Sequence, residues 1–77
     1  MTAAELAEII AQLRAGKRFS TRYTDHEWGI YAQPDGQFCH WSSDHAADQQ
    51  RNTSISAAQI ATLIGHLSYE RVSALLR

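Results

Sequence analysis

Side chains capable of catalysis or metal binding are present, but their spacing does not bring them together. The chain has four histidines and one cysteine among 77 residues, and a nucleophilic or metal site needs several such groups at convergent positions. Cys39 and His40 are neighbours in a run with the composition of a β-strand, so their side chains point to opposite faces and cannot share a metal ion. His40, Asp44 and His45 could approach one another at the end of that strand, but no CxxC or HxxxH spacing supports a zinc centre. We therefore expect no enzyme activity, no metal and no cofactor.

The elements that must position these residues are β-strands within residues 18–42. Three β-rich runs are separated by Asp25-His26 and by Pro34-Asp35-Gly36, and both separators are typical turn sequences. This pattern predicts a three-stranded antiparallel meander. We expect an α+β fold in which an N-terminal and a C-terminal helix pack on one face of the meander, in the order α-β-β-β-α.

The lengths of the two turns determine which side chains share a face of this meander. With two-residue turns at Asp25-His26 and Asp35-Gly36, Phe19 pairs with Ala32 and Ile30 pairs with Trp41. The buried face then holds Phe19, Thr21, Tyr23, Trp28, Ile30, Ala32, Cys39 and Trp41. The open face holds Arg18, Ser20, Arg22, Thr24, Glu27, Tyr31, Gln33, Phe38, His40 and Ser42. A three-residue turn with a bulge would break this agreement.

The first helix is marked by local signals at both of its ends. Thr2 and Glu5 have the spacing of a capping box, and apolar residues recur at helical spacing from Leu6 to Leu13. Gly16 suits the left-handed conformation that commonly follows a helix. The apolar stripe should lie on the buried face of the sheet.

The secondary structure of the second half of the chain is less well defined by the sequence pattern. Residues 43–55 have almost no apolar content and should form either a mobile excursion or a functional loop. Ser56 and Gln59 form a second capping box at the start of another helix. The apolar phase changes near Ser68, which predicts a kink or a restart there. Glu70–Leu76 then fits either a last helical segment or a fourth strand.

Composition places the chain among small globular domains. A single domain, residues 1–77, is expected from the length, and 44% hydrophobic with 19% charged residues is typical of a soluble chain. No apolar run approaches the ~20 residues that would cross a bilayer. The N-terminal segment is acidic and amphipathic, unlike a signal peptide, and one cysteine excludes an internal disulfide framework. We expect a cytoplasmic location.

The charges are segregated along the chain although the net charge is only −1. Residues 23–50 contain five acidic side chains and no lysine or arginine, whereas the segments on either side each carry a net charge of +2. Turn aspartates are common for local reasons. Alternatively, they form a surface that meets a basic groove of a partner. The predicted neighbours are Asp25 with Glu27, and Asp44 with Asp48.

Size, architecture and the run EIIAQLRAGKRFSTRYTDHEWGIYAQPDGQF, residues 8–38, resemble the small phage and prophage proteins grouped as anti-CRISPR and related anti-defence factors. The resemblance implies a non-enzymatic inhibitor in the cytoplasm of a host bacterium. Such an inhibitor docks on a CRISPR effector complex of the Cascade type and blocks target DNA binding. Our candidate partner-binding residues are the acidic residues and the residues predicted on the open face: Asp25, Glu27, Tyr31, Phe38, His40, Asp44 and Asp48.

Two other functions are consistent with the sequence. A small nucleic-acid-binding regulator would use the open face, through Arg18, Arg22, Tyr31, Phe38 and His40. The net charge gives little of the basic footprint that phosphate binding requires, which makes nucleic acid the less favoured partner. The third function is a homodimerising structural module. The predicted oligomeric state is a monomer or a weak homodimer.

Overall fold

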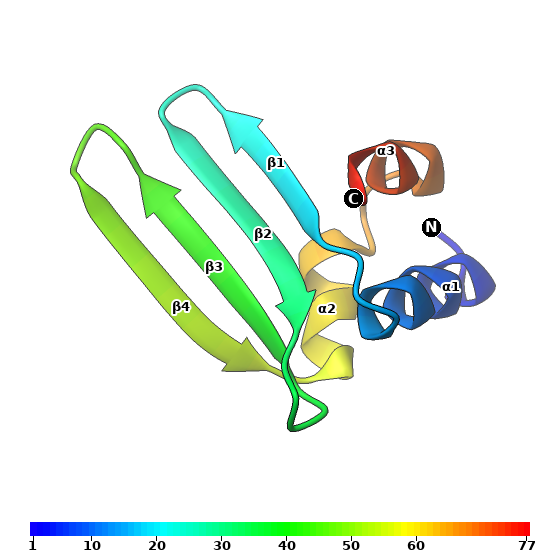
Figure 1. Ribbon diagram of the computed structural model, residues 1–77. Helices are drawn as coiled ribbons and strands as arrows, with labels where there is room; N and C mark the ends of the chain where they lie inside the picture. Colours follow the sequence, from blue (N-terminus) through cyan, green and yellow to red (C-terminus); the bar gives the residue numbers. More distant parts are fainter.

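The protein is an α+β fold in which a four-stranded antiparallel sheet packs against three helices (Figure 1). The computed structural model describes all of residues 1–77. The strands form a simple meander, with sheet order β1-β2-β3-β4. In chain order the elements are α1 (Ala3–Arg14), β1 (Phe19–Tyr23), β2 (His26–Ala32), β3 (Phe38–Asp44), β4 (Gln49–Ile55), α2 (Ala57–Ile64) and α3 (Tyr69–Leu75).

The fourth strand, β4, corrects the predicted three-stranded meander. It occupies the polar segment that was expected to be a loop, and it pairs with β3 along its whole length, from Phe38↔Ile55 to Asp44↔Gln49. Residues of the turn itself stabilise the chain reversal between β3 and β4. The Asp44 side chain accepts hydrogen bonds from the backbone N–H of Ala46 and Ala47, at 3.1 and 3.2 Å. Asp48 then adopts a positive φ of 51°, a conformation that Asp tolerates better than most residues.

The first turn of the meander is shifted from its predicted position, without consequence for the faces. It comprises Thr24 and Asp25 rather than Asp25 and His26, with Thr24 at φ 50°. Phe19 therefore pairs with Ile30 instead of Ala32. A shift of two residues preserves the side of the sheet on which each side chain lies.

The second turn is longer than predicted by an odd number of residues, and this makes the predicted faces of β3 wrong. Residues 33–37 connect β2 to β3, closed by a 2.8 Å bond from Gln33 N–H to the Gln37 carbonyl. Ile30 consequently pairs with His40 rather than Trp41. Phe38 and His40 lie on the face that the helices cover, whereas Cys39 and Trp41 lie on the opposite face. Because side chains alternate along a strand, a one-residue slip exchanges the two faces.

The core lies between the sheet and the helices at one end of the molecule. Its ten buried residues come from every element, and they are Ile9, Leu13, Phe19, Ile30, Phe38, Ile55, Ile60, Ile64, Val72 and Leu76. Trp28 packs against this cluster and is partly buried. Cys39 is buried as expected of a small core residue, but it lies outside the cluster on the other side of the sheet.

The helices begin where their capping signals predicted. Both capping boxes, Thr2 with Glu5 and Ser56 with Gln59, are formed in full. Ser68 caps a separate α3, so the restart predicted near this residue and the helical alternative for Glu70–Leu76 are confirmed. None of the helices is long and apolar enough to span a membrane.

The chain beyond α3 returns to the sheet. Leu76 forms an isolated antiparallel bridge with Phe19, and the backbones of Arg18 and Arg77 exchange hydrogen bonds of 2.9 and 2.8 Å. This short contact shields the beginning of the β1 edge. The β4 edge has no comparable cover, since β4 pairs with β3 alone.

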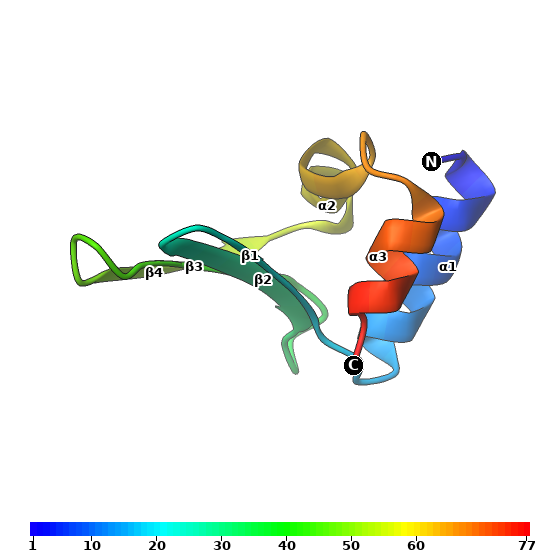
Figure 2. The same ribbon diagram turned by 90° about the horizontal axis from the view of Figure 1, so that it is seen from above.

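The sheet extends well beyond the helices at its other end (Figure 2). Both tight turns lie there, and the β1–β2 turn lies beside the β3–β4 turn (Figure 1). We call this end the sheet tip and define it by residues 24–27 and 44–48. The face of the sheet toward the helices is the inner face, and the opposite one is the outer face. The helices cover only part of the inner face.

Candidate binding surfaces of the sheet

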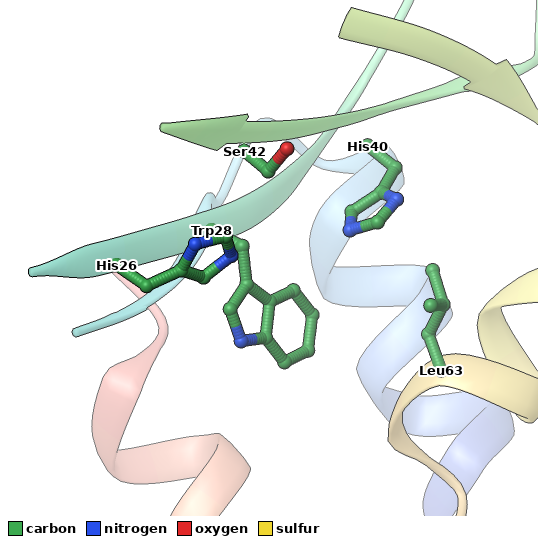
Figure 3. Close-up of a pocket in the computed structure, with 5 residues that line it drawn as sticks. All are labelled: His26, Trp28, His40, Ser42 and Leu63. Carbon is green, nitrogen blue, oxygen red and sulfur yellow. The ribbon is translucent and has the colours of Figure 1, made fainter. Parts of the chain in front are cut away.

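The inner face has a cleft where the cover provided by α2 ends. Its volume is about 320 Å³, and its lining comprises His26, Trp28, His40, Ser42 and Leu63. Figure 3 shows His26 and Trp28 extending from β2, His40 and Ser42 from β3, and Leu63 from α2. The strand pairing explains why they meet, because Trp28 faces Ser42 directly and His40 is one pair further along the same face.

Aromatic contacts hold the walls of this cleft in place. The Trp28 ring lies 5.3 Å from the Phe19 ring and 5.6 Å from the His40 imidazole, the second pair in an edge-to-face arrangement. Partial burial lowers the pKa of His40 below its ordinary value, because burial disfavours the imidazolium form. At neutral pH the cleft therefore presents an indole and a neutral imidazole beside the Ser42 hydroxyl.

The hydroxyl of Ser42 makes no hydrogen bond with either histidine of the cleft, His26 or His40, whereas an activated hydroxyl needs an adjacent base. No group of three or more His, Cys, Asp or Glu side chains is arranged to hold a metal ion. The lining combines two apolar side chains, Trp28 and Leu63, with three polar ones, His26, His40 and Ser42.

The sheet tip brings together two pairs of acidic residues that the sequence placed apart. The backbone N–H of His45 donates a 2.8 Å hydrogen bond to the Asp25 carbonyl, which ties the two turns together. In the register, Asp44 faces His26, and the Glu27 carboxylate lies 4.0 Å from the His45 imidazole. Asp25, Glu27, Asp44 and Asp48 thus share one end of the sheet.

Basic residues lie mostly away from the tip. Four of them lie at the opposite end of the sheet, near the end of α1 and the start of β1: Arg14, Lys17, Arg18 and Arg77. Only Arg22 and Arg51 lie on the strands close to the tip, where they face Glu27 and Ser42 respectively. Asp35 lies in the turn at the far end of the sheet, next to Gly36, whose carbonyl accepts a hydrogen bond from Arg14. The charge segregation seen in the sequence is therefore also a segregation in space.

The outer face presents two aromatic side chains, Tyr31 and Trp41. The Arg18 guanidinium carbon lies 4.6 Å from the centre of the Tyr31 ring, within the range of a cation–π contact. Trp41 faces Gly29 in the register. A side-chain carbon built on Gly29 would lie 2.7 Å from two carbons of the Trp41 indole, so the indole lies across the glycine. A hydrogen bond with Cys39 raises the pKa of Tyr31.

The structure separates the predicted site residues into four locations. The four acidic ones gather at the tip, and Tyr31 lies on the outer face with Arg18 and Arg22. Phe38 is completely buried in the core and cannot contact a partner, so its predicted exposure was wrong. His40 lies in the inner cleft and not on the open face, because the odd length of the second turn reverses β3.

The prediction missed Trp41 as an open-face residue. It had assigned this indole to the core, together with Cys39. One signal for its true position was present in the sequence: a glycine in the middle of a strand, here Gly29, often marks a site that another group approaches closely.

Comparisons of the chain with protein-family models, with curated proteins and with solved structures found no match.

Proposed function

We propose that the chain is a non-catalytic protein-binding domain that docks through its acidic sheet tip on a basic surface of a partner. The observation that carries this proposal is the convergence of Asp25, Glu27, Asp44 and Asp48 on an end of the sheet that projects beyond the helices (Figure 2). Carboxylates grouped in this way would steer the domain toward a positive surface and disfavour acidic partners.

The inner cleft supports the same proposal, because it opens beside the tip. His26 and Ser42 line both this cleft and a neighbouring hollow that includes Asp44 and Arg51. A partner that meets the carboxylates could therefore also insert an apolar side chain next to Trp28. Binding energy at protein interfaces is usually concentrated in such aromatic anchors, with charges at the rim. Charge at the tip would give orientation, and Trp28 would give affinity.

The narrower form of the proposal is that the partner is a CRISPR effector complex of the Cascade type, and that binding inhibits it. This form rests on the resemblance to anti-CRISPR proteins in size and texture. The chemistry is consistent, since a surface that receives target DNA is basic and a carboxylate-rich tip can occupy it. The carboxylates of the tip would then exclude DNA by binding the same basic side chains of the partner.

The experiment compares capture of partners from a bacterial lysate by the tagged wild-type chain and by charge-neutralised variants. The tip variant combines Asp25→Asn, Glu27→Gln, Asp44→Asn and Asp48→Asn. These changes remove charge but retain the side-chain acceptor, and Asn tolerates the positive φ of Asp48. Asp35→Asn is the matched control at the opposite end of the sheet, because Asn can still accept the hydrogen bond that Asp35 receives from Gln37 N–H.

We expect a partner that the wild type and Asp35→Asn enrich equally and that the tip variant loses. Equal enrichment by all three proteins would refute docking through the tip. For the narrower form, a purified surveillance complex is mixed with the chain before target DNA is added, and DNA binding is followed by mobility shift. Unchanged DNA binding at saturating chain would refute inhibition of that complex while leaving the general proposal to the capture experiment.

A further inference from the structure

We propose that the outer face of the sheet binds single-stranded nucleic acid, with one base stacked on Trp41. This site is separate from the acidic tip and from the inner cleft, since it lies on the opposite side of the sheet. A shallow hollow of about 300 Å³ on this face is lined by Arg18, which precedes β1, and by Tyr31, Trp41, Gln50 and Asn52 from β2, β3 and β4. The hollow combines an aromatic surface, a cation and two side-chain amides, which are the groups that contact bases and phosphates.

The stacking surface is created by the glycine at position 29. Because Gly29 has no side chain, the indole of Trp41 can approach the neighbouring strand closely, and a Cβ at position 29 would be 2.7 Å from two of its ring carbons. Trp41 is partly exposed. Every base has a π-face, so stacking on such a ring tolerates many sequences.

The charges of the outer face fit a phosphate backbone. Arg18 is held over the Tyr31 ring at 4.6 Å, which places its guanidinium beside the hollow. Arg22 lies on the same face, four residues after Arg18, and is exposed. Glu27 is the one carboxylate among the strand residues of this face, and it lies directly opposite Arg22. The acidic residues of the tip turns are at the end of the sheet and leave the hollow free of negative charge.

The composition of the outer face suits contacts with nucleic acid. Its strand positions are Ser20, Arg22, Glu27, Gly29, Tyr31, Cys39, Trp41, Ser43, Gln50, Asn52 and Ser54. None of these residues is Leu, Ile, Val or Met, so the face has no aliphatic side chain to bury. Its amides and hydroxyls can instead form hydrogen bonds with exposed base edges.

The test measures binding of a fluorescein-labelled oligothymidine of about fifteen nucleotides by anisotropy, with RNA of equal length and duplex DNA as further probes. We expect the single strands to bind and to quench tryptophan fluorescence, and the duplex to bind more weakly because its bases are already stacked. Trp41→Ala should weaken binding by about 5- to 150-fold. Arg71→Gln, an exposed change on α3, is the control for general loss of charge and should bind as the wild type does.

A second variant keeps the test valid if Trp41→Ala does not fold. Arg18→Gln combined with Arg22→Gln leaves the core untouched and removes two cations. For the wild type, two phosphate contacts predict a slope of log affinity against log salt of about −1.4, and the double variant should lose most of it. Absence of wild-type binding, equal binding of duplex, or binding unaffected by both the Trp41 and the arginine variants would overturn the proposal.

The outcome is separable from that of the proposed function. The acidic tip variant should bind the oligonucleotide as well as the wild type does, or more tightly, because it has lost only negative charge. If the Trp41 and arginine variants instead lose a captured protein and the wild type does not bind oligonucleotides, the outer face is a protein interface and the nucleic-acid proposal is wrong.

Discussion

Replacement of Phe38 by alanine tests the register on which every surface assignment depends. Phe38 has no exposed surface, belongs to the ten-residue core cluster and lies 4.7 Å beneath the Arg14 guanidinium. Truncation of a buried phenylalanine typically costs ~3–5 kcal/mol, from lost transfer energy and from the cavity left behind. A domain of this length has a free energy of unfolding of about 4–12 kcal/mol. Phe38→Ala should therefore remove a large part of the stability or unfold the protein.

The assay is urea denaturation followed by circular dichroism, with the change in free energy taken from the midpoint at constant slope. Phe38→Leu is the matched variant that retains most of the buried volume, and we expect it to cost less than about 2 kcal/mol. If Phe38→Ala changed the free energy of unfolding by less than about 0.5 kcal/mol, as surface substitutions do, Phe38 would be on the open face. The reasoning about β3, Trp41 and His40 would then fail together.

Substitutions at three further positions test other parts of the structure. Gly29→Ala should cost about 1–3 kcal/mol in urea denaturation, because its Cβ would clash with the Phe19 carbonyl oxygen and with the Trp41 indole; a neutral effect would contradict the close approach. Ser56→Ala should cost ~1 kcal/mol and Ser56→Gly only a few tenths, since the hydroxyl caps α2; equal losses would contradict the capping role. Burial lowers the pKa of His40, so the unfolded state binds a proton more readily, and stability should fall as pH drops from above 6.5 through the lowered pKa. His40→Gln should flatten that fall in a series of thermal melts, and an unchanged pH profile would contradict the burial of the imidazole.

Local signals made the helices predictable. The capping box that begins α1 and the one that begins α2 are each formed by residues three positions apart, so the sequence pattern and the structure report the same contact. The restart at Ser68 is visible for the same reason, since the change of apolar phase and the cap are both local. Here tertiary contacts did not overrule local preferences.

The faces of the sheet were predicted correctly only where an error in turn position left the alternation of side chains between the two faces unchanged. The β1–β2 turn was misplaced by one residue, which shifts the pairing by two and leaves each side chain on its predicted face. The 33–37 connection differs from the expected length by an odd number, and β3 is reversed as a result. Turn residues indicate that a reversal occurs, but they do not fix its length.

The strand β4 could not be found from apolar alternation. Its residues from Gln49 to Ser54 are all exposed, and only Ile55 is buried. An edge strand beyond the helices needs no apolar face, so the hydrophobic pattern that identifies a half-buried strand is missing. Its order comes from pairing with β3 and from the Asp44 turn.

The candidate surfaces could be predicted only as far as the strands that carry them. The excess of acidic residues in the middle of the chain was readable, but its convergence at one end depends on β4, whose turn brings Asp44 and Asp48 beside Asp25 and Glu27. The presence of both Tyr31 and Trp41 on the outer face could be predicted only with the correct register of β3. The predicted register placed Phe38 there instead of Trp41.

The most direct test of docking through the tip is amide hydrogen exchange of the chain, free and bound to its captured partner. If the partner binds the tip, amide exchange should slow in residues 24–27 and 44–48, and the exchange rates of α1 and α3 should not change. Slowed exchange in α1 or α3, with the two turns unaffected, would show that the partner binds elsewhere and would contradict the account.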